Sequence, residues 1–160
     1  MIIALGADHR GLEARQHLQE WLARNEYDVV NCDTEPGRSN DYPDVVYKVA
    51  TLVARREAAA GVLVGGTGIG MSIAANKVTG VRAALVHDEI GAEMSRRHND
   101  SNVLCLAADM LGMRIIDKIV FKWLTADFEG GRHARRVAKI AAIEQGLDPT
   151  TVSDSAGVGE

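Results

Sequence analysis

The sequence has no long run of apolar residues and only two cysteines. No stretch approaches the roughly 18 consecutive apolar residues that a membrane-spanning helix needs, and no signal peptide is recognisable ahead of the first expected strand. Cys32 and Cys105 lack the spacing of a metal or redox motif. These absences predict a cytoplasmic protein whose two cysteines remain reduced thiols.

Basic residues are not in excess either. The formal net charge of −4 argues against a general nucleic-acid binder, although it permits local basic clusters. With 160 residues, of which 46% are hydrophobic and 25% charged, the chain has the size and composition of one globular domain with a real core. We expect that domain to span residues 1–146, followed over residues 147–160 by a flexible tail rich in Ser, Thr, Gly and Asp.

Short apolar runs alternate along the chain with amphipathic stretches of helical period. The runs predict strands at residues 1–5, 27–31, 60–64, 81–86 and 103–106. Helices are expected at residues 12–24, 41–56, 88–97, 109–124 and 132–145, with Asp41 and Asp109 as N-caps, and a shorter helix ends near residue 77. Residues 32–40 are polar and read as a loop. The alternation predicts βαβ units, a five-stranded parallel sheet and helices on both of its faces.

A glycine-rich loop follows the third expected strand. Gly65, Gly66, Gly68 and Gly70 fall within six residues, and a helix of small residues comes next. Glycines at this density let backbone N–H groups converge on an anion, and a helix start adds further N–H groups and the positive end of a dipole. The loop therefore predicts a pocket for a phosphate or a developing oxyanion, with a plain strand-to-helix turn as the alternative.

The glycine loop differs from the two best-known nucleotide-binding patterns. In Gly66-x-Gly68-x-Gly70 the third glycine falls one residue earlier than in G-x-G-x-x-G, and no Gly-Lys-Ser/Thr ends the loop, which excludes a Walker P-loop. Asp88 follows the next expected strand, where an acid that binds the ribose of NAD could stand. NAD binding therefore remains an alternative, although a single small domain leaves no second domain for a substrate.

Two polar pairs stand at the ends of expected elements. Asp8 and His9 directly follow the first strand, where they could hold sugar hydroxyls or a phosphate; alternatively, Asp8 caps the next helix beside an exposed histidine. His98 and Asn99 end a helix, where an imidazole could act as general acid–base and an amide could donate to an oxyanion. Simple complementation of the helix dipole by basic residues explains the second pair equally well.

A basic segment opens the last expected helix. Arg132 and Arg136 lie four residues apart, so both guanidinium groups face the same way, and His133 stands at the same helix start. Two arginines on one face suit the several oxygens of a phosphate monoester. A solvated basic patch is the alternative interpretation.

Taken together, these segments resemble the type B ribose-5-phosphate isomerases over residues 1–145. The resemblance rests on Asp8-His9, Asp41-Tyr42-Pro43, the run from Gly66 to Lys77, Arg97-His98-Asn99-Asp100 and Gly130-Gly131-Arg132-His133-x-x-Arg136, in that order. It implies a Rossmann-like three-layer α/β/α sandwich and a homodimer, sometimes paired into tetramers, whose active sites are built from both subunits. It also implies that no metal ion or organic cofactor is needed.

The implied reaction interconverts ribose 5-phosphate and ribulose 5-phosphate by ring opening and proton transfer through a cis-enediolate. His98 looks like the group that opens the ring, Asn99 a further substrate contact, and Arg132 with Arg136 the phosphate clamp. The full set of implied catalytic residues is His98, Ser72 and Thr67, and the set of implied substrate contacts is Asp8, His9, Tyr42, Gly66, Gly68, Ile69, Gly70, Asn99, Arg132, His133 and Arg136.

The sequence departs from this family at the base that moves the proton. One branch of the family has a cysteine just before the glycine loop, where this chain has Gly65, and another has a glutamate after it, where this chain has Met71. Neither side chain accepts a proton, which leaves Asp8, Ser72 and Cys32 as candidates; a thiol within an apolar strand, as at Cys105, is less suited. An isomerase for a tetrose or hexose phosphate, or a non-catalytic protein that binds sugar phosphates, stays open.

Overall fold

The computed structural model describes residues 1–32 and 41–153. Its five strands form one sheet in the order β2-β1-β3-β5-β4, and every neighbouring pair is parallel. The strands are β1 (Ile2–Ala7), β2 (Asp28–Asn31), β3 (Ala60–Gly65), β4 (Ala83–Leu85) and β5 (Val103–Ala107). The predicted parallel sheet is confirmed, with β2 and β4 at its two edges.

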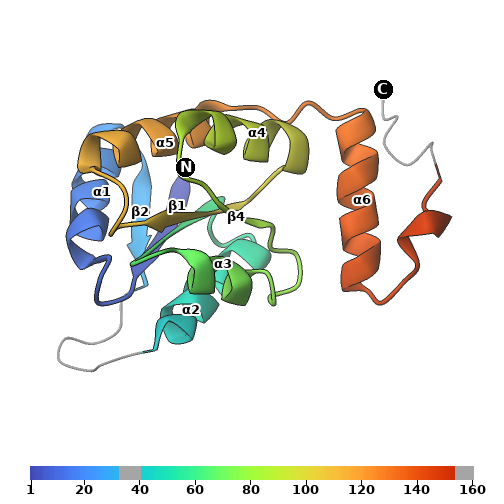
Figure 1. The fold of residues 1–160 in the computed structure, drawn as a ribbon, viewed down its shortest axis with the longest axis horizontal. Helices are drawn as coiled ribbons and strands as arrows, with labels where there is room; N and C mark the ends of the chain where they lie inside the picture. Colours follow the sequence, from blue (N-terminus) through green and yellow to red (C-terminus); the bar gives the residue numbers. More distant parts are fainter. Residues whose placement is uncertain (33–40, 154–160) are drawn as a thin grey trace.

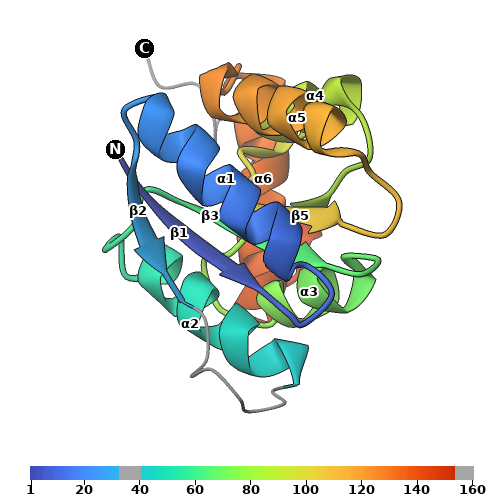
Figure 2. The same ribbon diagram turned by 90° about the vertical axis from the view of Figure 1, so that its left-hand side faces the viewer.

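Helices cover both faces of this sheet, which gives the three-layer sandwich that was predicted (Figures 1 and 2). The helices are α1 (Leu12–Arg24), α2 (Tyr42–Ala54), α3 (Ile69–Ala75), α4 (Glu89–Asn99), α5 (Met113–Thr125) and α6 (Arg132–Glu144). Helices α1, α4 and α5 lie on one face and α2 and α3 on the other, whereas α6 stands beside the sandwich.

The alternation of side chains along each strand explains the two layers of core. In β3, Val62 and Val64 face the cluster that includes α1 and α5, while Leu63 between them packs with α2 and α3. All three are fully buried. Because both faces of a central parallel strand are covered, its residues are apolar on both sides, and this is why the strands read as continuous apolar runs.

Helices α1 and α3 leave the carboxyl ends of the neighbouring strands β1 and β3 toward opposite faces of the sheet. The strand order reverses direction between β1 and β3, which makes their carboxyl ends a topological switch point. At such switch points open α/β sheets bind their ligands. The backbone N–H of Asp8 donates to the carbonyl of Val64 at 3.2 Å, which ties the two strand ends together.

The predicted helix start is correct for α2 and wrong for α5. Asp41 precedes α2 and Pro43 lies in its first turn, as predicted, but the Asp41 side chain makes no capping hydrogen bond. Asp109 does not cap α5, which begins at Met113 after Gly112. Its carboxylate instead accepts from Arg10, which follows a different strand. The loop predicted over 32–40 lies outside the described residues from 33 onward.

Strand β4 is shorter than predicted and lies at an open edge of the sheet. The amide of Asn76 covers part of this edge. Its Nδ2 donates to the carbonyl of Ala83 at 2.9 Å, and its Oδ1 accepts from the Ala83 N–H at 2.8 Å. The side chain thus pairs with the backbone as a neighbouring strand would.

Helix α6 and the residues after it form the most peripheral part of the structure (Figure 1). Within the tail predicted at 147–160, a short 3-10 helix, η1 (Pro149–Thr151), is capped by Asp148, whose Oδ1 accepts from the Thr150 N–H at 2.8 Å. Residues 154–160 lie outside the described range. None of the helices within residues 1–32 and 41–153 has the length and apolar character that a membrane span requires.

Candidate active site

The glycine loop leaves β3 at this switch point and turns directly into α3. Gly68 has a φ of +71°, and a Cβ added there would lie 2.6 Å from Leu85 Cδ1 and 3.0 Å from the Leu106 carbonyl oxygen. Only glycine accommodates both the left-handed backbone and this close approach. An added Cβ on Gly70 would lie 2.6 Å from Tyr42 Cζ, so the aromatic ring of Tyr42 covers the first turn of α3.

Two carboxylates border the loop, one at each of its first two glycines. An added Cβ on Gly66 would lie 2.8 Å from Asp109 Oδ2. That oxygen accepts from Arg10 Nε at 2.7 Å and pairs with its Nη2 at 2.7 Å. The hydrogen bond and charge of Asp109 raise the pKa of Arg10. The Arg10–Asp109 ion pair therefore stands over Gly66 as a neutralised unit.

Asp8 is the second carboxylate, and it stands beside Gly65. Its Oδ1 accepts from the backbone N–H groups of Arg10 at 2.9 Å and of Gly11 at 3.1 Å. These bonds are close to the predicted alternative in which Asp8 caps the next helix, because they fix the backbone of the residues just before α1. Its Oδ2 points toward Gly65, where an added Cβ would lie 3.1 Å away, and accepts no hydrogen bond from any residue that the structure describes. His9 beside it is exposed.

A second polar group gathers where α4 ends and α6 begins. The rings of His98 and His133 are stacked with centroids 4.1 Å apart and planes 1° from parallel. Glu129 Oε2 lies 3.4 Å from His133 Nε2 and 3.8 Å from His98 Nε2. Its other oxygen accepts from Arg97 Nε at 2.7 Å, and this bond is the main reason why the pKa of Glu129 is lowered. Glu129 thereby links His133 of α6 to Arg97 and His98 of α4.

His133 is the buried member of this group, with a relative exposure of 4%. Burial lowers its pKa, and the neighbouring His98 and Arg132 lower it further. Its Nε2 accepts from Arg132 Nε at 3.4 Å. Its Nδ1 is buried without a partner among the residues described. His98 is the more exposed ring of the pair, with a side-chain exposure of 36% against 5% for His133.

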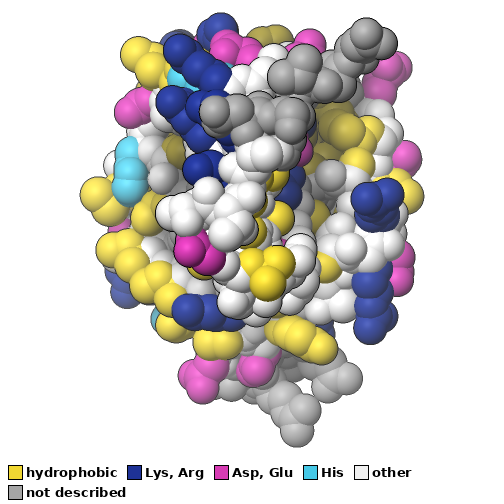
Figure 3. Space-filling model, turned by 90° about the vertical axis from the view of Figure 1, so that its right-hand side faces the viewer, with side chains coloured by type: hydrophobic (Ala, Val, Ile, Leu, Met, Phe, Trp, Pro, Cys, Tyr) yellow, Lys and Arg dark blue, Asp and Glu magenta, His cyan; other side chains and the backbone are white. Residues whose placement is uncertain are grey.

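Arg132 and Arg136 lie one turn apart on α6, and both are exposed. Figure 3 views the molecule from the side on which α6 stands, and Lys and Arg side chains gather near the top of that face. The helix begins after Gly130 and Gly131, which have φ values of +66° and +52°. This turn brings the arginines beside the stacked histidines, in line with the expected spacing on one face.

The predicted site residues fall into two groups at opposite ends of the strands, one at the carboxyl ends and one near the amino ends. Helix α4 begins after Asp88 beyond the carboxyl end of β4 and ends just before β5, and Arg82, which precedes β4, donates to the Asn99 carbonyl at 3.1 Å. Eleven residues of helix span about 16 Å. The glycine-loop group comprises Asp8, His9, Tyr42, Gly66, Thr67, Gly68, Ile69, Gly70 and Ser72, and the histidine–arginine group comprises His98, Asn99, Arg132, His133 and Arg136. One chain does not bring the two groups together.

Neither cysteine is placed to act in the glycine-loop group. Cys105 lies within β5 with no exposed surface, and burial raises the pKa of its thiol to about 12. Cys32 is 5% exposed, packs against α2, and its Sγ lies 3.7 Å from the Val30 carbonyl oxygen. Ser72 is half-buried in the first turns of α3. The cysteine candidates for the base are therefore disfavoured by their surroundings.

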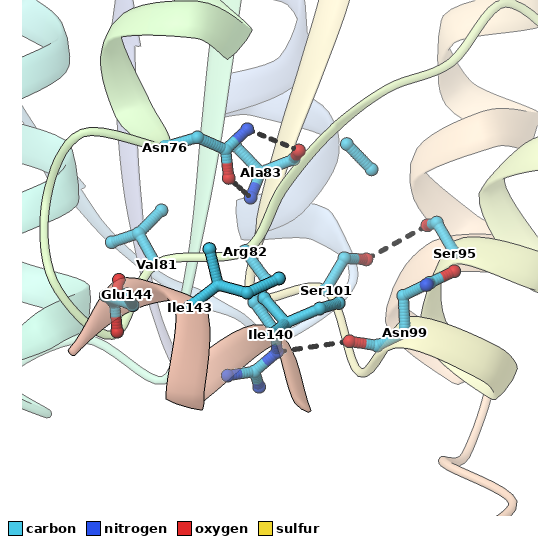
Figure 4. A pocket seen from close by; sticks show the side chains of 11 residues that line it. Asn76, Val81, Arg82, Ala83, Ser95, Asn99, Ser101, Ile140, Ile143 and Glu144 are labelled. Atoms are coloured by element: carbon cyan, nitrogen blue, oxygen red, sulfur yellow. Dashed lines mark hydrogen bonds between the residues drawn. The ribbon is translucent and has the colours of Figure 1, made fainter. Parts of the chain in front are cut away.

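A cavity of about 380 Å³ lies between α6 and the β4 edge of the sandwich. Ile140 and Ile143 of α6 point toward the segment that contains Val81 (Figure 4). Their exposed fractions of 42% and 61% show that much of this apolar surface is uncovered in a single chain. Asn99 contributes to the same wall, so the groove is continuous with the histidine–arginine group rather than with the glycine loop.

Sequence reasoning missed three residues that shape these groups. Glu129 stands directly before the Gly130-Gly131 turn, and its position beside a basic helix end could have suggested a partner for Arg97. Arg10 and Asp109 each follow the carboxyl end of a strand, which is the signal for residues that meet at one edge of a parallel sheet.

The donor atoms of His98, Glu129 and His133 lie within 4.8 Å of one another. Two imidazoles and a carboxylate are a set that binds zinc in other proteins. The two rings are stacked face to face, so they would have to separate to direct both nitrogens at one ion. The geometry thus fits a pair of histidines held by a carboxylate better than a prebuilt metal centre.

Comparison with known proteins gives consistent similarities across nearly the whole chain. A family model described as ribose/galactose isomerase matches residues 3–140. Ribose-5-phosphate isomerase B of Escherichia coli is 41% identical over 143 residues, which covers 89% of this chain and 96% of that protein. The structure of the Clostridium thermocellum ribose-5-phosphate isomerase B is 44% identical, with a TM-score of 0.89 over 91% of this chain and 99% of that one.

A further similar structure contains a sugar phosphate. Ribose-5-phosphate isomerase B from Mycoplasma genitalium, determined with bound ribulose-5-phosphate, is 40% identical and superposes with a TM-score of 0.84 over 90% of this chain and 96% of that one. The polar groups described above all lie within residues 3–140, which the family model matches.

Proposed function

The chain belongs to the ribose/galactose isomerase family, and we propose that it interconverts ribose 5-phosphate and ribulose 5-phosphate in a site shared by two copies of the chain. The observation that carries this proposal is the glycine loop at the switch point of the sheet, bordered by a carboxylate. Backbone N–H groups there suit the oxygens of an enediolate, which is the intermediate of aldose–ketose isomerisation.

The reaction needs a group that opens the furanose ring, donors for the oxyanion and an anchor for the phosphate. His98 is the exposed member of a stacked histidine pair that Glu129 holds in place, which suits a general acid–base. Arg132 and Arg136 offer two guanidinium groups to a phosphate. In the proposed roles, the glycine-loop group holds the sugar carbons and the histidine–arginine group holds the ring oxygen and the phosphate.

A homodimer is supported by the separation of these two groups within one chain. A second copy that places its histidine–arginine group over the glycine loop would complete the site, and two-fold symmetry would complete the other site in the same way. The exposed apolar side chains of α6 and the adjoining cavity offer a surface for such a contact. We also propose a cytoplasmic protein that works without a cofactor.

Mixed dimers test the shared site. Asp8→Ala disables the glycine-loop group, and Arg132→Ala disables the histidine–arginine group. Refolding the two variants together in equal amounts makes half of the dimers mixed, each with one intact site of two, so about a quarter of wild-type activity should return. A mixture as inactive as its parts would show that each site belongs to one chain.

The substrate is tested with the terminal phosphates of tetroses, pentoses and hexoses. The family description names both a pentose and a hexose, so sugars of different length need to be compared. Turnover is followed in deuterated water, where an exchanging base labels the ketose product at C1. The highest kcat/KM is expected for ribose 5-phosphate. A chain that binds these sugars but neither converts them nor exchanges C1 hydrogen would be a sugar-phosphate binding protein on the same scaffold.

A further inference from the structure

Isomerisation requires a base beside C1 and C2 of the sugar. The two residues that flank the glycine loop cannot be this base. Gly65 has no side chain, and the thioether of Met71 takes no proton. Met71 is 2% exposed, and its Cγ would lie 3.0 Å from a Cβ on Gly65. The space next to the loop is therefore filled on one side by an inert side chain, and the remaining neighbour is Asp8.

The two oxygens of Asp8 have different surroundings. Backbone N–H groups of Arg10 and Gly11 hold Oδ1, so the carboxylate has a defined orientation. Oδ2 faces Gly65, and a Cβ added to that glycine would lie 3.1 Å from it. Oδ2 receives no hydrogen bond from residues 1–32 or 41–153. A fixed carboxylate with one open oxygen next to an oxyanion-binding loop has the geometry that a general base needs.

Asp109, the other carboxylate on the loop, lacks this openness. Its Oδ2 is bound twice by the guanidinium of Arg10, which neutralises it. The two acids thus occupy matched positions at Gly65 and Gly66 but differ in availability. This contrast singles out Asp8 and supplies a control for it.

We propose that Asp8 is the base that transfers the proton between C1 and C2, an inference that rests on the proposed isomerase function. In the aldose-to-ketose direction, Oδ2 takes the proton from C2 as the C2–H bond breaks. The released electron pair forms the C1–C2 double bond, and the carbonyl electrons move to O1. The O2–H proton then passes to O1, Asp8 returns its proton to C1, and the C2 carbonyl forms.

The first experiment compares Asp8→Asn with Asp109→Asn, starting from ribulose 5-phosphate, which has no furanose ring to open. Asn keeps the shape of Asp and the Oδ1 acceptor. We expect kcat to fall about 10²–10⁴-fold in Asp8→Asn, with C1 exchange in deuterated water lost in parallel, and far less in Asp109→Asn. The Kd of ribitol 5-phosphate, a probe without a carbonyl, should change less than about threefold.

Two results would overturn the assignment. In one, Asp8→Asn keeps a tenth or more of the wild-type kcat. In the other, ribitol 5-phosphate binding falls as far as kcat does, which would make Asp8 a binding residue only. Failure of the wild-type chain to convert any sugar phosphate refutes the isomerase function itself, so the two failures are distinguishable.

A second experiment uses the wild-type chain and does not depend on the folding of a variant. An epoxide analogue of the substrate, 1,2-anhydropentitol 5-phosphate, places an electrophilic carbon where the base acts. Attack by Oδ2 opens the epoxide and forms an ester, with the alkoxide taking a proton. Mass spectrometry should locate one ester, on Asp8, with loss of activity in proportion. A label on His9, Ser72 or Cys32 would contradict the proposal.

Discussion

Replacement of Gly68 by alanine tests how the glycine loop is anchored to the core. A non-glycine residue at a φ of +71° costs about 1–2 kcal/mol in the left-handed region. The added methyl also meets Leu85 Cδ1 at 2.6 Å and the Leu106 carbonyl oxygen at 3.0 Å, and such overpacking costs a further ~1–3 kcal/mol. We expect the free energy of unfolding to fall by about 2–5 kcal/mol in total.

Gly80→Ala is the matched control, because Gly80 has a φ of +85° and an added Cβ there would meet nothing within 4 Å. Only the backbone cost of about 1–2 kcal/mol applies to it. Both variants are measured by urea denaturation at one protein concentration, because a dimer gains stability with concentration. If the two losses agree within about 0.5 kcal/mol, the contact with Leu85 and Leu106 does not constrain the loop and the reasoning is wrong.

Three further predictions concern the second group and the core. Arg136→Ala should raise KM for ribose 5-phosphate about tenfold or more through the loss of a charged hydrogen bond, whereas Lys139→Ala on the next turn of α6 should change KM little; equal effects would argue for a general basic patch. Burial lowers the pKa of His133 from 6.5, so the unfolded chain binds a proton at a higher pH than the folded chain does, and the free energy of unfolding should decline as pH falls from about 6.5 toward the lowered value. Urea titrations of His133→Gln should show a weaker decline with pH, and a decline as steep as in the wild-type chain would contradict this reasoning. Trp123→Phe removes the 2.8 Å hydrogen bond to Ser101, and thermal unfolding should register a loss of about 1–2 kcal/mol at this buried site, with no loss if the bond contributes nothing.

The fold was predictable because its signals are local and repeated. Each central strand is covered on both faces, so runs such as Val62-Leu63-Val64 carry no polar residue, and the helices between them keep their own period. The order of strands in the sheet carries no such local signal. It depends on which neighbours pack best after collapse, and the sequence pattern alone did not specify it.

The sequence indicates candidate site residues but does not indicate how they are arranged. Asp109 looked like a helix cap because that choice follows from its nearest neighbours, yet its partner is Arg10, which stands 99 positions away in the chain. The role of Glu129 was hidden for the same reason, since Arg97 and His98 reach it from α4. Contacts between distant segments decide these cases, and periodicity contains no information about them.

The amide of Asn76 has a consequence for how this molecule can associate. By occupying the outward N–H and carbonyl of Ala83, it denies a template to any extended chain that approaches the open edge of β4. Two copies are therefore prevented at this point from fusing their sheets into one continuous ribbon. A contact made at this edge by another chain would have to rely on side-chain shape and charge, and the covered backbone does not offer a template for fibrous aggregation at this point.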